Sequence, residues 1–272
     1  MKFFPKENDC AFDSVNYFWR VIYSFRTWLL AVFFMLFFAN RLHAADTPVD
    51  YLEPKAFTGK IYSDASLKKV LFTFSRTATN SGSEIHVVRE FNLPNGKLAA
   101  REKVVYDGTR LKSLMLEEFQ NGSEGMAKVE TKDGESKINF NFTEGSTRKT
   151  GSEKFLNEIL TSDMVGPFIA AHFDEIAQGA VVKCRLISVS RAETVGFKFV
   201  KESDTTWHGK PAILIALQPS SIIIARLVDP LHFVVEKEGI HRVLEYTGRT
   251  TPSIEKNGKW EDLDAVTVFD WK

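Results

Sequence analysis

Hydrophobic and polar residues alternate along most of the chain after about residue 70. Val70, Phe72 and Phe74 fall on one side of such a run, and Ile138, Phe140 and Phe142 repeat the pattern later. A period of two predicts strands with one buried face and one solvated face. We therefore expect about eleven strands between residue 70 and the end of the chain.

Short polar turns separate these runs. Asn-Gly and Asp-Gly between alternating segments are strong hairpin signals, because glycine accepts the positive φ that tight turns require. The chain carries Asn-Gly or Asp-Gly turns at 94–96, 107–108, 121–122 and 133–134, and a Glu-Gly turn at 144–145. Strands joined in this way lie antiparallel to their neighbours, so the pattern predicts an antiparallel meander.

The period changes in the middle of the chain. The apolar residues of 152–160 recur at helical spacing, and a second apolar stripe in 164–178 contains Phe168, Ile169 and Phe173. Pro167 falls in the first turn of that second segment, where proline is tolerated. We expect a two-helix insert at about 152–178. The apolar segment 222–228 fits either a strand or a short helix.

These elements predict a mainly β domain. About eleven antiparallel strands in one domain curl or close, so we expect a curved antiparallel sheet or an incomplete β-barrel. The two helices of the insert would cover its concave opening and bury the apolar face.

The N-terminal segment has the three parts of a secretory signal. Basic residues precede an uncharged run, 27–39, and small residues follow at Ala44 and Ala45. The run is shorter than the roughly 20 residues that a membrane-spanning helix needs. We expect a signal peptide at 1–44, an extended lead-in at 45–55 and one β-rich domain at 56–272. The alternative is an uncleaved inner-membrane anchor with the domain facing the periplasm.

Charge and cysteine content narrow the class of protein. Residues 1–44 hold five of the 35 basic and three of the 35 acidic residues, which leaves 30 basic and 32 acidic residues in the exported part. This balance argues against nucleic-acid binding, which needs a basic excess. Cys10 leaves with the signal, so Cys184 has no internal disulfide partner. An exported domain without disulfides indicates a bacterial periplasm.

No constellation of residues forms a catalytic signature. Ser66 to Lys69 and Lys149 to Gly151 match two motifs of penicillin-recognising serine enzymes, but the third motif is out of order. His172 and Glu175 share a helix face and could bind a metal or act as an acid–base pair. A solvated polar face is the simpler interpretation, because no second histidine follows at the spacing of a metalloprotease helix.

The C-terminal third resembles a known kind of protein. The segments 229–236 (DPLHFVVE) and 242–249 (RVLEYTGR) are similar to the closing hairpin of an uncharacterised family of bacterial periplasmic β-rich proteins. The order of signal, meander, helical insert and second meander also resembles the periplasmic carrier proteins of the lipoprotein-sorting pathway. That resemblance implies a curved, incomplete barrel with helices over its opening and an apolar cavity for acyl chains. It assigns no binding residue, and the pattern identifies no arginine facing the cavity.

The number of phenylalanines is consistent with such a cavity. Fourteen of the 23 phenylalanines lie after residue 44. An ordinary core accounts for most of them, and the others would line a cavity beneath the helices. We expect non-catalytic binding of a lipid or acyl chain, without cofactor or metal. The residues expected to line that cavity are Phe168, Ile169, Phe173, Phe140, Phe142 and Phe233. The alternative is a structural or protein-interaction factor of the cell envelope that has an envelope protein as its partner and no small ligand.

Overall fold

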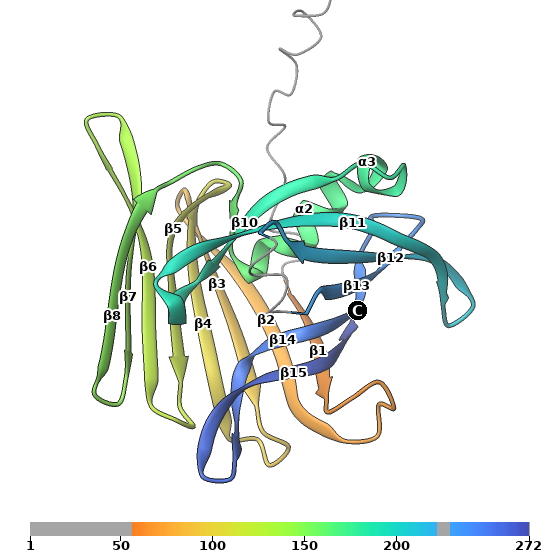
Figure 1. Ribbon diagram of the computed structural model, residues 1–272, viewed down its shortest axis with the longest axis horizontal. Helices are drawn as coiled ribbons and strands as arrows, with labels where there is room; N and C mark the ends of the chain where they lie inside the picture. The colour runs from red at the N-terminus through yellow and green to blue at the C-terminus, as the bar shows by residue number, and fades with distance from the viewer. Residues whose placement is uncertain (1–55, 222–228, 272) are drawn as a thin grey trace, which may run out of the picture. The chain divides into compact units, whose positions relative to one another are not determined.

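The computed structural model describes residues 56–221 and 229–271. In these residues the chain forms one open, curved, mainly antiparallel sheet with short helices inserted in the middle of the sequence (Figure 1). The predicted mainly β class is thus confirmed. The expected signal segment 1–44, the lead-in 45–55 and the ambiguous segment 222–228 lie outside the described residues.

The sheet has two halves that follow the order of the chain. Its strands lie side by side in the order β8-β7-β6-β5-β4-β3-β2-β1-β15-β14-β13-β12-β11-β10-β9. The first half consists of β1 (Ala56–Tyr62), β2 (Val70–Ser81), β3 (Glu84–Asn92), β4 (Leu98–Asp107), β5 (Arg110–Glu118), β6 (Ser123–Lys132), β7 (Glu135–Glu144) and β8 (Thr147–Lys154). Each strand pairs antiparallel with the next, and the connections from β3 to β8 are the predicted turns.

The helical insert and the second half of the sheet follow. The insert contains a short β9 (Ile159–Leu160), the 3-10 turn η1 (Ser162–Met164) and the helices α2 (Val165–Ala171) and α3 (Phe173–Ala177). The second half consists of β10 (Val182–Ser188), the 3-10 turn η2 (Val189–Arg191), β11 (Glu193–Trp207), β12 (Lys210–Pro219), β13 (Leu231–Glu236), β14 (Val243–Lys256) and β15 (Lys259–Asp270). Pairing of β15 with β1 joins the two halves, and β9 pairs parallel with β10.

The described residues contain 15 strands, so the expected number of about eleven was wrong. Three strands, β1, β8 and β9, were not predicted from the alternation of hydrophobic and polar residues. In β1, Gly59 interrupts the series of apolar side chains. Glycine is needed there because a Cβ would lie 2.8 Å from the carbonyl oxygen of Val268 on β15. Strand β8 is polar and mostly exposed, and β9 has two residues. None of the three has the hydrophobic period on which strand prediction depends.

The predicted helix at 152–160 was also wrong. Ser152, Glu153 and Lys154 complete β8, where pairing with β7 satisfies their backbone groups, and Ile159 and Leu160 form β9. Tertiary pairing thus overrides the helical spacing of the apolar residues. The second predicted helix, 164–178, exists as α2 and α3, which are separated at His172, where φ is −106° and ψ is 14°.

The two ends of the curved sheet approach each other at η2. A Cβ on Gly125 of β6 would lie 2.3 Å from Val189 Cγ1, and a Cβ on Gly151 of β8 would lie 2.0 Å from the carbonyl oxygen of Ala192. Side-chain bonds also join the ends: the Thr194 N–H donates to Glu153 Oε1 at 2.8 Å, and Lys149 Nζ donates to the Ser190 carbonyl at 2.9 Å. Glycine is required at these positions because the two backbones come close together.

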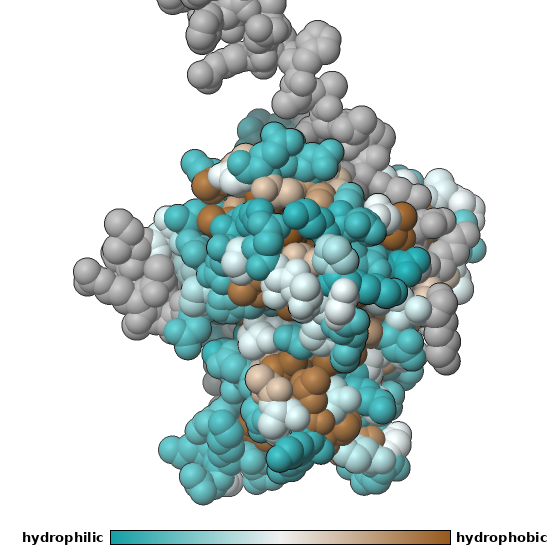
Figure 2. All heavy atoms as spheres, turned by 90° about the vertical axis from the view of Figure 1, so that its right-hand side faces the viewer, coloured by the Kyte–Doolittle hydropathy of each residue, from teal (hydrophilic) through white to brown (hydrophobic). Residues whose placement is uncertain are grey.

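The main core lies on the inner face of this curve. Figure 1 shows β10 to β13 crossing over the strands of the first half at a steep angle, with α2 and α3 beside them. Buried apolar residues from both halves and from the helices form one cluster, and a smaller cluster lies under β1 to β4 and β15. The face in Figure 2 is largely hydrophilic, with apolar residues gathered in the lower part of the view. Among the described residues, we find no helix with the length and apolar character needed to span a membrane.

Candidate functional site

The candidate site is a cavity of about 980 Å³ inside the curve of the sheet. Strands from both halves and the helical insert contribute to its wall. Strands β10 to β13 supply a mainly apolar wall that includes Leu186, Phe197, Leu217, Leu231 and Phe233. These positions point inward because alternate residues of a strand face the same side of the sheet.

Helix α2 forms part of the wall with its small residues. Gly166, Pro167 and Ala170 line the cavity together with Val165, and residues three and four apart share one face of a helix. The neighbouring face carries Phe168, whose ring centroid lies 5.5 Å from that of Phe199 on β11. The large side chains of α2 therefore fill the core, and its small ones leave the cavity open.

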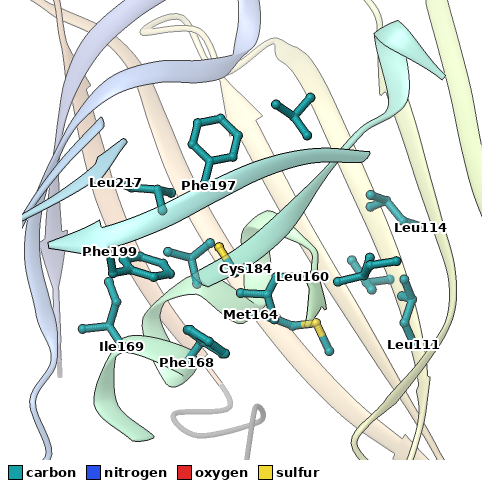
Figure 3. Close-up of a cluster of buried hydrophobic side chains, with 14 of the residues drawn as sticks. Leu111, Leu114, Leu160, Met164, Phe168, Ile169, Cys184, Phe197, Phe199 and Leu217 are labelled. Carbon is teal, nitrogen blue, oxygen red and sulfur yellow. The ribbon is translucent and has the colours of Figure 1, made fainter. Parts of the chain in front are cut away.

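The six expected cavity residues separate into two groups. Phe142 on β7 and Phe233 on β13 belong to the cavity wall. The other four are buried in the main core and are not part of that wall: Phe140, Phe168, Ile169 and Phe173. Figure 3 shows Phe168 and Ile169 directed toward Phe199 and the strands above them.

A buried ion pair connects the floor of the cavity to the helical insert. Arg76 of β2 donates to Asp163 of η1 from Nε at 2.5 Å and from Nη2 at 3.1 Å, and both side chains are 2% exposed or less. The Tyr106 hydroxyl donates to Asp163 Oδ2 at 3.1 Å. Burial, followed by the charge of Asp163, raises the pKa of Tyr106 well above its usual range. The start of α2 is thereby held against the sheet.

A second ion pair lies beside the first. Arg89 of β3 is directly opposite Arg76 in the strand register, and Glu102 of β4 is directly opposite Arg89. Two like charges facing each other across strands are unfavourable. Glu102 compensates the charge of Arg89, with which it pairs, as Asp163 compensates that of Arg76. Ser162 donates to Glu102 Oε2 at 3.1 Å and Thr251 donates to Oε1 at 2.6 Å, so the insert, β4 and β14 meet here.

Sequence reasoning did not find these cavity arginines. The signal that could have found them is the strand period itself, because Arg76 continues the inward positions of Phe72 and Phe74 on β2. Arg89 likewise stands between Val87 and Phe91, two buried residues of β3. A charged residue at an inward position of an apolar stripe indicates a partner from elsewhere in the chain.

One end of the cavity is acidic. Glu118, Glu144 and Asp262 belong to its wall, and the negative charges of Asp262 and Glu144 both act on Glu118. The pKa of Glu118 is raised, mainly by burial, although hydrogen bonds from Ser253 oppose the change. Its Oε2 accepts from the Ser253 N–H at 3.0 Å. Arg249 pairs with Asp262, so carboxylates and a cation lie together at this end of the cavity.

The histidine, glutamate and cysteine considered as chemical candidates are His172, Glu175 and Cys184. His172 Nδ1 lies 3.5 Å from Glu175 Oε1, and the side chains are 31% and 64% exposed. No group of three or more metal-ligating side chains exists in the described part of the chain. Cys184 is buried with a free thiol, and burial raises its pKa to about 12, which suppresses the reactive thiolate. These residues provide no arrangement for nucleophilic or metal-assisted chemistry.

Comparisons with protein-family models, curated proteins and solved structures found no match. The resemblance to periplasmic lipoprotein-sorting carriers therefore remains a hypothesis, and the function must be argued from the cavity.

Proposed function

We propose that this protein binds a lipophilic molecule of the cell envelope, an acyl chain or a lipid, in the cavity and without catalysis. The proposal includes export to the periplasm, as the N-terminal sequence predicts. It also treats the curved sheet as an incomplete barrel, with α2 and α3 covering its opening.

The size and character of the cavity carry the proposal. Its volume of about 980 Å³ lies at the upper end of the roughly 300–1,000 Å³ found for small-molecule sites. Apolar side chains of β10 to β13 supply one wall, and burying a methylene group there would contribute about 0.8 kcal/mol. A chain of a dozen carbons could thus be bound with micromolar affinity, or about −8 kcal/mol.

The arrangement of the helical insert also supports the proposal. The ion pair between Arg76 and Asp163 fixes η1, and α2 begins at the next residues with its small side chains toward the cavity. A core optimised only for stability would fill this space, because protein interiors pack at the density of organic crystals. Small residues at the wall of a large cavity are typical of a space kept open for a guest.

A pair of matched variants tests the proposal. Ala170 lines the cavity, whereas its neighbour Ala171 on the same helix is exposed and outside the wall. Ala170→Trp should occupy the cavity and weaken the binding of a fluorescent fatty acid at least tenfold. Ala171→Trp should bind the probe as the natural protein does. Far-UV circular dichroism and thermal unfolding of both variants control for loss of fold.

Two outcomes would contradict the proposal. If the natural protein binds no lipid probe at saturating concentration, the cavity is not a lipid site, and a structural or protein-interaction role in the envelope becomes the better hypothesis. If Ala170→Trp is folded and binds the probe unchanged, the lipid is held elsewhere on the molecule.

A further inference from the structure

Among the residues that the structure describes, Arg242 is a cation of the cavity wall without a carboxylate partner. The other arginines of the wall each have a carboxylate partner: Arg76, Arg89, Arg191 and Arg249. Arg242 has no such partner among residues 56–221 and 229–271, and its Nε is buried without a hydrogen bond within the same ranges. A buried guanidinium nitrogen that lacks an acceptor is costly, so an anionic guest would supply what this side chain lacks.

The surroundings hold Arg242 in place without neutralising it. Its guanidinium carbon lies 5.8 Å from the ring centroid of Trp271. Trp271 is fixed in turn, because its Nε1 donates to the Val243 carbonyl at 2.8 Å and its ring lies 4.4 Å from that of Phe57. The carboxylate of Glu236 accepts a hydrogen bond from the backbone N–H of Arg242 at 3.4 Å and not from the guanidinium.

Arg242 lies far from the group of carboxylates in the cavity wall. Arg242 lies by Trp271, just beyond the end of β15, whereas Asp262 stands near the beginning of the same strand. At about 3.3 Å per residue, the strand separates these two positions by roughly 30 Å. Glu118 and Glu144 lie near Asp262, which pairs with Arg249 of the same wall. An anionic group would thus find a cation without a carboxylate partner at Arg242, whereas Arg249 near Asp262 is already paired.

We propose that the ligand is an amphipath with an anionic headgroup, a carboxylate or a phosphate, which binds Arg242 while its acyl chain lies along the apolar wall. This inference rests on the proposed function and adds the headgroup and the orientation of the guest. A guanidinium presents parallel N–H donors that match the oxygens of a carboxylate or phosphate. The stacked Trp271 ring would hold that fork in position.

The test compares guests that share a chain but differ in the headgroup. Binding of dodecanoate, dodecyl phosphate and 1-dodecanol to the exported protein is measured at pH 8 by displacement of a fluorescent lipid. We expect both anions to bind at least tenfold more tightly than the alcohol. Acetate and inorganic phosphate are included to detect a site for free small anions, and we expect neither to displace the probe.

Variants then assign the preference to a residue. Arg242→Gln should weaken dodecanoate binding to the level of the alcohol and leave dodecanol binding unchanged. Arg101→Gln is the matched control: Arg101 also lies beside an aromatic ring, Phe119, but it pairs with Glu90 and is outside the cavity wall. It should keep the full preference for the anion.

The outcomes separate this inference from the proposed function. Equal affinity of the natural protein for dodecanoate and dodecanol would overturn the headgroup assignment and leave the lipid cavity intact. Displacement of the fluorescent lipid by acetate or inorganic phosphate, which have no acyl chain, would indicate a site for free small anions instead. Failure of all three chains to bind would reject the proposed function itself. If Arg242→Gln does not fold, the comparison of anion and alcohol in the natural protein still decides.

Discussion

Replacing Asp163 should destabilise the protein more than any surface change, because Asp163 compensates a buried charge. Its side chain is 1% exposed, that of Arg76 is 2% exposed, and two hydrogen bonds join them. Asp163→Ala removes the carboxylate of Asp163 from the buried guanidinium and removes an acceptor from the Tyr106 hydroxyl. Breaking a buried pair from one side costs about 3–5 kcal/mol.

The effect is large compared with the total free energy of unfolding, which is about 5–15 kcal/mol for most domains. With a urea slope of about 3 kcal/mol per M, the unfolding midpoint should fall by roughly 1–2 M. Circular dichroism during urea unfolding at pH 7 measures this shift. As a control, Lys128→Met removes an exposed pair with Glu130 and should leave the midpoint nearly unchanged, because water and salt weaken such pairs.

A double-mutant cycle makes the reasoning refutable. Replacing both partners, as in Arg76→Met with Asp163→Leu, should cost much less than the sum of the two single replacements, because neither charge of this pair remains. Additive costs would show that the two side chains are not coupled. A loss of less than about 1 kcal/mol for Asp163→Ala, which is the scale of an exposed pair, would show that Asp163 is not the counterion that holds η1 in place.

Three further predictions follow from other parts of the molecule. Gly151→Ala should cost about 1–3 kcal/mol because the new Cβ would overlap the Ala192 carbonyl. Gly166→Ala should be neutral or stabilising, because its new Cβ would lie 3.8 Å from its nearest neighbour. Urea unfolding compares the stabilities of the two variants, and equal effects would show that β8 and η2 are not in close contact. Because the pKa of Glu118 is raised in the fold, its protonated form favours folding below about pH 4.5, and this contribution is lost as the pH rises through the folded-state pKa. Glu118→Gln should therefore improve stability, relative to the natural protein, more at pH 7 than at pH 4, and a difference independent of pH would contradict the assignment. The exported protein should begin at Ala45 or within a few residues of it, as intact mass spectrometry would report; a full-length product extracted from the membrane would favour the uncleaved anchor.

The sequence alone determined which face of most strands is buried and where most hairpins turn. Both properties are local: side-chain direction alternates along a strand, and a tight turn needs glycine at the position of positive φ. Phe72 and Phe74 are buried as the alternation predicts, and Gly108 and Gly122 have positive φ in the predicted turns. Where the local pattern was weak, as in the polar β8 and the two-residue β9, prediction failed.

Tertiary structure decided the shape of the cavity and the state of the charges in its wall. Asp163, which pairs with Arg76, lies 87 positions away along the chain. The local sequence pattern is the same whether or not such an arginine has a partner. Tertiary contacts also divided the expected cavity residues, leaving Phe142 and Phe233 in the wall and Phe168 in the core. Long-range pairing brings these segments together, and it depends on how the strands of the described residues curl as one sheet rather than on the residues adjacent in sequence.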